Sequence, residues 1–217
     1  MINKTNYNID CFLSAHVVGS GAWPGYEADR RDHLMYAMTH VTLPGDILEF
    51  GVYRGKTITQ IAGFLSDRRI WGFDSFEGLP EDWHMTKNTD NIKFPKGAFE
   101  VDRLPWVPDG VTLVKGWFDE TIPTWKQKNS DSKISMLHVD CDLYSSTKEV
   151  LTQLNSHIVP GTVIVFDDMY LWKNPQGYEL WHQGEYQALK EWLEQFDREF
   201  EVVSRNRYMQ CAIRVTK

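Results

Sequence analysis

The sequence has little cysteine, and the few cysteines are far apart. Cys11, Cys141 and Cys211 are odd in number and form no Cys-x-x-Cys pair. Small secreted domains held together by disulfides use many more cysteines in an even set. The scarcity favours reduced thiols and a cytoplasmic protein.

Long apolar runs and an excess of basic residues are also missing. No stretch is long enough to span a bilayer, and no basic amphipathic segment suggests binding to a membrane surface. Acidic residues outnumber basic ones 30 to 23, which gives a formal net charge of −7. Because nucleic-acid binding depends on neutralising phosphates with Lys and Arg, we expect neither a nucleic acid nor a membrane as partner.

The chain does have enough apolar residues for one hydrophobic core. Hydrophobic residues make up 42% of its 217 residues, and a chain of this length fits one domain. We therefore expect a single domain over residues 1–217. Within it, residues 1–44 should form an N-terminal cap, and the Pro- and Gly-containing residues 75–110 a long loop that serves as a lid or binding element.

Short apolar runs alternate with segments of helical periodicity, which is typical of an α/β sheet with parallel strands. Strands are expected at residues 46–51, 70–74, 111–115, 134–139 and 162–166, with a closing hairpin at 200–203 and 209–215. Helices are expected at residues 29–41, 55–66, 121–126, 146–156 and 184–196.

Carboxylates follow two of the expected strands directly. Asp140 and Asp142 come after one apolar run, and Asp167 and Asp168 come after another. Because parallel strands end at the same edge of a sheet, these acids should repel one another unless something positive lies among them. A hard divalent cation suits such oxygen ligands and predicts a metal site beside a ligand crevice. Capping of the following segments is the alternative role of these acids.

A glycine turn joins the first expected strand to the helix after it. Residues 49–57 read EFGVYRGKT, in which Gly51 and Gly55 allow a sharp turn and the close approach of a ligand. Asp74, at the end of the next strand, follows Gly51 by 74 − 51 = 23 residues. An acid at that position can accept hydrogen bonds from ribose hydroxyls.

Three classes of ligand compete for this crevice. A dinucleotide site needs a middle glycine that the segment lacks, and a Walker phosphate loop needs one more residue between its glycines. S-adenosylmethionine carries a sulfonium cation and no phosphate. The acidic side chain of Glu49 would attract such a cation, whereas it would repel a ligand that carries phosphate. A plain strand-turn-helix without a ligand is the remaining alternative.

Five segments between residues 45 and 170 carry a resemblance to a known family. They are LEFGVYRG at 48–55, GFDSFEGLP at 72–80, KGWFDETIP at 115–123, HVDCDLYSST at 138–147 and PGTVIVFDD at 160–168. In this order and spacing they resemble the TylF family, the macrocin, mycinamicin and novobiocin type of sugar O-methyltransferase. The resemblance implies a Rossmann-like class I methyltransferase fold, with a seven-stranded, mostly parallel sheet, an antiparallel last strand and helices on both faces.

The resemblance also implies S-adenosylmethionine as donor, a divalent metal, usually Mg²⁺, a small-molecule or glycan acceptor with a sugar hydroxyl, and a homodimer. The metal ligands would be Asp140, Asp167 and Asp168, and the base would be Asp142 or Asp140 itself. The donor-binding residues would be Glu49, Gly51, Tyr53, Arg54, Thr57, Asp74, Ser75, Gly116, Trp117, Phe118 and Asp140. Trp117 and Phe118 would flank the adenine, with ordinary packing as the alternative. Thr162 replaces a frequent glycine, and the short amino end predicts a reduced lid.

Several alternatives remain open at this point. A catechol-like phenol needs the same metal as a sugar hydroxyl, and a nucleotide-dependent transferase, a dehydrogenase or a non-catalytic sugar-binding module could share the fold. His84 and His182 are secondary candidates for the base, whereas His138 fits a core position. Arg30 and Arg31 are candidates for acceptor contacts.

Overall fold

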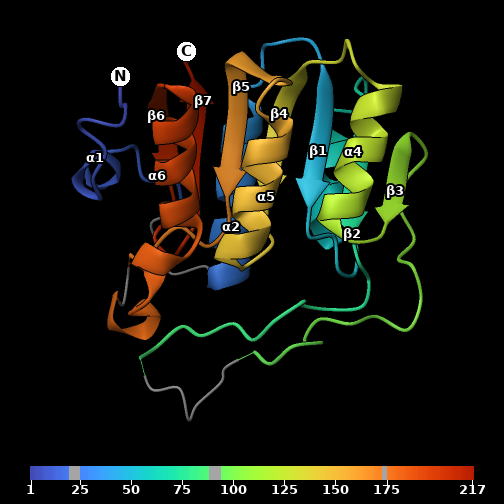
Figure 1. Cartoon of the computed structure of the whole chain (residues 1–217), viewed down its shortest axis with the longest axis horizontal. Helices are drawn as coiled ribbons and strands as arrows, with labels where there is room; N and C mark the ends of the chain where they lie inside the picture. The colour runs from blue at the N-terminus through green and yellow to red at the C-terminus, as the bar shows by residue number, and fades with distance from the viewer. Residues whose placement is uncertain (20–24, 88–93, 173–174) are drawn as a thin grey trace.

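The computed structural model describes residues 1–19, 25–87, 94–172 and 175–217. One seven-stranded sheet runs through it in the order β3-β2-β1-β4-β5-β7-β6 (Figure 1). The first five strands are parallel, and β7 is antiparallel to both of its neighbours, as predicted. The strands are β1 (Asp46–Phe50), β2 (Ile70–Asp74), β3 (Val111–Lys115), β4 (Ile134–Val139), β5 (Ile158–Phe166), β6 (Phe200–Arg205) and β7 (Cys211–Val215).

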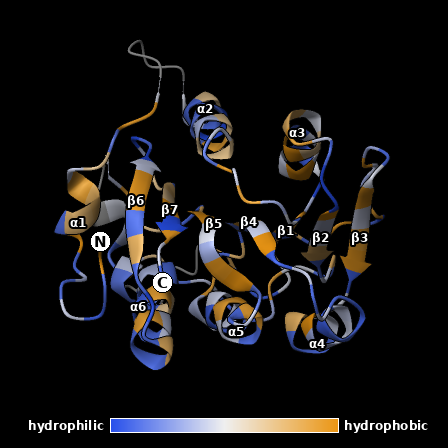
Figure 2. Ribbon diagram, turned by 90° about the horizontal axis from the view of Figure 1, so that it is seen from above, coloured by the Kyte–Doolittle hydropathy of each residue, from blue (hydrophilic) through white to orange (hydrophobic). Residues whose placement is uncertain are grey.

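Helices cover both faces of the sheet (Figure 2). On one face lie α2 (Tyr26–Met38) and α3 (Lys56–Phe64). On the other face lie α4 (Phe118–Lys128), α5 (Tyr144–Leu154) and α6 (Glu185–Phe196). The short helix α1 (Asp10–Leu13) lies beside β6, and the 3₁₀ turns η1 (Pro175–Tyr178) and η2 (Trp181–Gln183) precede α6. Among the described helices, none combines the length and apolar character needed to cross a membrane.

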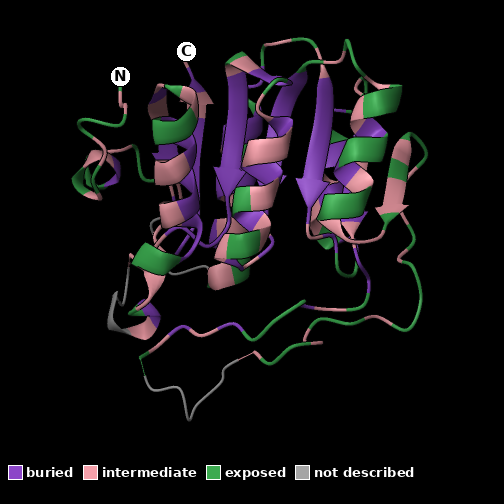
Figure 3. Ribbon diagram, viewed as in Figure 1, coloured by how far each residue is buried: buried purple, intermediate pink, exposed green. Residues whose placement is uncertain are grey.

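The central strands are apolar because helices cover both of their faces. Every residue of β1 and β4 is buried, whereas β3 at the edge is half-buried or exposed (Figure 3). Continuous apolar strands are expected between two helical layers. The polar side chains within these strands have partners: the Ser135 hydroxyl donates to the carbonyl of Asp46 at 3.0 Å, and His138 contacts Glu49.

The register of β1, β4 and β5 brings the predicted site residues together. The last residues of these strands are register partners. The residues that follow, Gly51, Asp140 and Asp167, therefore leave the sheet side by side. Each backbone N–H still donates to a neighbouring strand at 2.9 Å. The parallel ladder thus positions these residues at one edge of the sheet.

Three elements are longer than predicted, the first being β6, which ends at Arg205 rather than Val203. Helix α4 begins at Phe118 rather than Thr121 and contains Pro123, which removes one helical hydrogen bond without ending the helix. Strand β5 begins at Ile158 rather than Thr162 and crosses an irregularity in its pairing with β4. The Thr162 hydroxyl bridges this irregularity, because it donates to the carbonyl of Ile134 at 2.7 Å and accepts the N–H of Val159 at 3.0 Å.

The predicted cap divides into two parts. Residues 2 and 17 form bridges to Phe200 and Arg205, so the chain before α2 follows the outer edge of β6. Helix α2, in contrast, reaches the carboxyl ends of the strands. The loop at residues 75–110 crosses below these ends (Figure 1) and contains no helix or strand in its described portion. Residues 20–24 of the cap and 88–93 of the loop lie outside the described residues.

Candidate functional site

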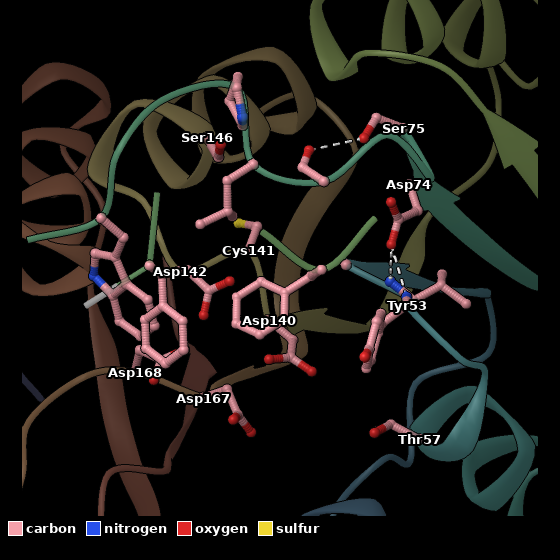
Figure 4. A pocket seen from close by; sticks show the side chains of 18 of the residues that line it. Tyr53, Thr57, Asp74, Ser75, Asp140, Cys141, Asp142, Ser146, Asp167 and Asp168 are labelled. Atoms are coloured by element: carbon pink, nitrogen blue, oxygen red, sulfur yellow. Dashed lines mark hydrogen bonds between the residues drawn. The ribbon is translucent and has the colours of Figure 1, made fainter. Parts of the chain in front are cut away.

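A cavity of about 1020 Å³ opens at the carboxyl ends of β1, β2, β4 and β5 (Figure 4). The first turn of α2 and the loop at 75–110 complete its wall. It is lined by all four predicted catalytic or metal-ligating acids, Asp140, Asp142, Asp167 and Asp168. Of the other predicted donor-binding residues, Gly51, Tyr53, Arg54, Thr57, Asp74, Ser75, Trp117 and Phe118 line it as well. Glu49 and Gly116 do not.

The glycine turn after β1 forms one end of the cavity. Gly51 has a φ of +90°, and a Cβ built on it would lie 1.8 Å from the carbonyl oxygen of Asp140. The Asp74 carboxylate accepts the backbone N–H groups of Val52 and Tyr53 at 2.8 and 2.7 Å (Figure 4). With the N–H of residue 76 at 2.7 Å, Asp74 accepts three hydrogen bonds. Since a carboxylate has about four acceptor sites, Asp74 can accept one more donor from a ligand.

Glu49 lies in β1 beneath the cavity wall rather than in it. Its side chain is fully buried, and its Oε1 lies 3.0 Å from Nδ1 of His138. Burial raises the pKa of Glu49 to about 7. Burial opposes the charge on His138, but its contacts with Asp167 and Glu49 outweigh this effect and raise its pKa to about 10. The carboxylate of Glu49 thus faces a buried imidazole, and its role in donor binding stays a prediction.

Four carboxylates converge at the other end of the cavity (Figure 4). The ligating atoms of Asp140, Asp142 and Asp168 lie within 4.8 Å of one another, and so do those of His138, Asp140 and Asp167. Asp140 belongs to both groups. We call the four aspartates and His138 the acid cluster. The predicted convergence of these acids is confirmed.

Part of the positive charge that the acid cluster requires comes from Arg30 on α2. Its Nε donates to Asp167 Oδ1 at 2.8 Å, and its Nη2 pairs with Asp140. Burial alone would raise the pKa of Asp167, but Arg30 and His138 lower it. Arg30 therefore contacts the acids instead of only facing the acceptor space. Arg31 is not among the cavity-lining residues and pairs with Asp32 at 2.9 Å.

On its other side, the acid cluster lies next to a further carboxylate, that of Glu185. Burial and mutual repulsion raise the pKa values of Asp142, Asp168 and Glu185 well above their ordinary range. Glu185, at the start of α6, accepts the N–H of Asp168 at 2.9 Å through Oε2. Its Oε1 is buried and has no hydrogen-bond partner among the described residues. This arrangement of oxygen atoms fits a hard divalent cation such as Mg²⁺.

Aromatic side chains of the long loop form an apolar wall beside the glycine turn. Trp83 stacks on Phe94 with ring centroids 5.1 Å apart, and Phe99 contacts both Phe94 and Tyr53 at 5.1 and 5.7 Å. All four residues line the cavity. On the donor side, Phe118 also lines the cavity and packs edge-on against Phe50 at 5.1 Å. Phe118 therefore packs against β1 and also faces the cavity.

The two secondary candidates for the base do not line the cavity. His84 and His182 are both absent from its wall. Sequence patterns missed Arg30 as a partner of the acids and Glu185 as a neighbour of Asp168. The only signal for Arg30 was the surplus of acids, which required an unspecified cation.

Comparison with known proteins gives consistent matches. A family model described as Macrocin-O-methyltransferase (TylF) matches residues 26–199. The chain is 30% identical to the 8-demethyl-8-(2,3-dimethoxy-alpha-L-rhamnosyl)-tetracenomycin-C 4'-O-methyltransferase of Streptomyces olivaceus, over 64% of this chain and 59% of that protein. It is 29% identical to the mycinamicin III 3''-O-methyltransferase of Micromonospora griseorubida, over 58% of this chain and 56% of that protein. The chain thus spans less than two thirds of the length of these relatives.

Solved structures share the fold. The calicheamicin methyltransferase CalS11 has a TM-score of 0.62 and 24% identity, covering 85% of this chain and 77% of its own. The O-methyltransferase NovP has a TM-score of 0.61 and 23% identity, covering 88% of this chain and 81% of its own.

Proposed function

The chain belongs to the macrocin O-methyltransferase (TylF) family, and from this membership we propose that it transfers a methyl group from S-adenosylmethionine to a sugar hydroxyl. One observation carries the proposal: the glycine turn and the acid cluster line the same cavity. The glycine turn and Asp74 lie at one end, and the acid cluster lies at the other. A relative named for a rhamnosyl-tetracenomycin supports an acceptor that carries a sugar.

The donor end of the cavity suits a nucleoside with a cationic tail. S-adenosylmethionine would supply an electrophilic methyl group on its sulfonium. Gly51 leaves room for the ligand beside the backbone, and Asp74 retains acceptor capacity for a ribose hydroxyl. Trp117 and Phe118 line the same end, where they would flank the adenine.

We propose that Asp140, Asp167 and Asp168 hold a divalent cation, for which Mg²⁺ is the first candidate. When bound, the cation would lower the proton affinity of a nearby acceptor hydroxyl. The buried acids and the unpaired Oε1 of Glu185 support a cation at this place. Without it, the Asp142 side of the cluster would keep its negative charge only at a large desolvation cost.

Asp142 is the proposed general base. Burial, followed by repulsion from Asp140 and Asp167, raises its pKa well above the ordinary range. A general base works best when its pKa lies near the working pH, which is above the ordinary range of a carboxyl group. As the acceptor oxygen forms its bond to the methyl carbon, the carbon–sulfur bond breaks and the hydroxyl proton moves to the Asp142 carboxylate. Asp140 is the alternative base.

The test is methyl transfer from labelled S-adenosylmethionine to a panel of deoxysugar glycosides and catechols, with product detection by mass spectrometry. We expect glycoside methylation that chelation by EDTA stops and Mg²⁺ restores. Asp142→Asn should lower turnover by about 10²- to 10⁴-fold and leave S-adenosylhomocysteine binding unchanged. The exposed Asp109→Asn is the matched control.

Each part of this proposal has its own contradicting result. Full activity of Asp142→Asn would mean that another group is the general base. Full activity in EDTA would show that the reaction does not require a divalent cation. Methylation of catechols without any glycoside product would replace the sugar acceptor with a phenol.

A further inference from the structure

Arg30 lies where a cation between Asp140 and Asp167 would lie. Its Nε donates to Asp167 at 2.8 Å and its Nη2 pairs with Asp140. The side chain of Arg30 is 19% exposed and that of Asp167 is 3% exposed, so little water screens the pair. A guanidinium stays charged at every physiological pH. Arg30 therefore neutralises these two carboxylates at any physiological pH while it contacts them.

Asp167 has little acceptor capacity left while Arg30 is in this position. Its Oδ1 accepts from Arg30 and lies 3.8 Å from Nε2 of His138. Its Oδ2 accepts from Gln210 at 3.1 Å and from the Tyr26 hydroxyl at 3.4 Å. Three of these contacts are hydrogen bonds, whereas 3.8 Å is too long for one. About one of the four acceptor sites of the carboxylate therefore remains, and it lies on Oδ1, the oxygen that Arg30 already contacts. A metal ligand must direct at least one oxygen lone pair at the ion.

Electrostatic repulsion also prevents the Arg30 guanidinium and a divalent ion from binding the two carboxylates at the same time. A divalent ion bound to Asp140 and Asp167 would lie within a few ångströms of the guanidinium. Like charges at that distance repel strongly in a poorly solvated site. Either Arg30 or the ion can occupy the space between the two carboxylates, but both cannot.

We propose that Arg30 is an internal counter-ion that competes with the divalent cation, so that metal binding releases Arg30 and metal loss returns it. The inference rests on the metal part of the proposed function. Arg30 and Tyr26 belong to the first turns of α2 and line the cavity. Release of Arg30 therefore changes the wall that faces the acceptor, and it couples the metal to that wall.

The test measures metal binding directly, without catalysis. Metal-stripped full-length protein is titrated with Mn²⁺, and the free ion is measured by electron paramagnetic resonance. Arg30→Ala should bind Mn²⁺ on the order of tenfold more tightly than wild type, because the competitor is gone. Arg31→Ala, which removes an exposed arginine from the next position of the same helix, should bind like wild type. Asp168→Asn should weaken binding in every background.

Stability provides a second readout. In EDTA, Arg30→Ala should unfold at a lower temperature than wild type, because the carboxylates lose their counter-ion. Mn²⁺ should then raise its unfolding temperature by more than it raises that of wild type. If Arg30→Ala does not fold, Arg30→Lys takes its place. Lysine keeps the charge but not the two-pronged contact, so it should bind Mn²⁺ more tightly than wild type.

The outcomes separate this inference from the proposed function. Equal or weaker Mn²⁺ binding by the Arg30 variants than by wild type overturns the competition and leaves the metal site in place. Absence of Mn²⁺ binding in wild type and variants alike removes the metal from the proposed function, and the inference is overturned with it.

Discussion

Gly51 is the residue at which the backbone itself shapes the cavity. Its φ of +90° and the 1.8 Å approach of an added Cβ to the Asp140 carbonyl oxygen leave no room for a side chain. Asp74 then holds the next two backbone N–H groups. One glycine and one carboxylate therefore fix the distance between the donor end and the acid cluster.

The change Gly51→Ala tests this role at the level of one methyl group. Because the new Cβ meets fixed backbone of β4 and requires a disfavoured φ, we expect a loss of about 3 kcal/mol or more in the free energy of unfolding. Urea denaturation measures it. Gly63→Ala is the control, because Gly63 lies in α3 with no heavy atom within 4 Å of the added Cβ. It should stabilise the protein by up to about 1 kcal/mol. A Gly51→Ala variant as stable as wild type would contradict the close approach.

Helix α2 is the element that joins the sheet to the acid cluster. Arg30 and His33 are three residues apart and share its inner face. His33 is fully buried, and its Nε2 lies 3.1 Å from the Ser204 hydroxyl on β6. Burial lowers the pKa of His33 to about 4. The packing of this histidine thus places Arg30 at the cavity.

The pH dependence of stability tests the packing of α2. The pKa of His33 is lower in the folded state, about 4 instead of 6.5, so the unfolded state binds more protons between these values. Stability should therefore fall as pH decreases from about 6.5 to 4, by about 1.4 kcal/mol for each unit of pKa difference. His33→Gln should reduce this slope in urea denaturation at pH 7 and pH 5. An unchanged slope would mean that His33 is not a buried neutral histidine.

The elements show which parts of the fold follow from sequence. The predicted ranges of β2, β3 and β4 agree with the structure, because each is a short, mainly apolar run bounded by charged residues or glycines. The first part of β5 was missed because Pro160 and Gly161 are typical of turns, and only the tertiary contacts of Thr162 extend the strand there. The acid cluster was predictable because consecutive strand ends meet at one edge.

Side-chain partners between distant elements were not predictable from pattern. Glu49 follows the family motif, yet its carboxylate faces His138 because β1 and β4 pair in a register that places these residues opposite each other. Arg30 and Glu185 lie on helices whose orientation over the sheet depends on packing. Their contacts with the acids therefore appear only in the folded structure.

At the scale of the whole molecule, strand order creates the crevice. The chain builds β1, β2 and β3 toward one edge and then β4 and β5 toward the other, so the direction reverses between β1 and β4. Ligands of open α/β sheets bind at such a reversal, outside the carboxyl ends of the strands. Gly51 and Asp140 follow the two strands on either side of it. The cavity opens at this reversal, with Gly51 and Asp140 in its wall.

The most direct test of the central claim, donor binding in this crevice, is thermal unfolding with S-adenosylhomocysteine, NAD or ATP. A ligand at one hundred times its Kd adds about 2.7 kcal/mol of stability, or roughly 5–11 °C for a chain of this size. We predict a shift of that order with S-adenosylhomocysteine and none with NAD or ATP. A shift with NAD or ATP and none with S-adenosylhomocysteine would contradict the methyltransferase assignment.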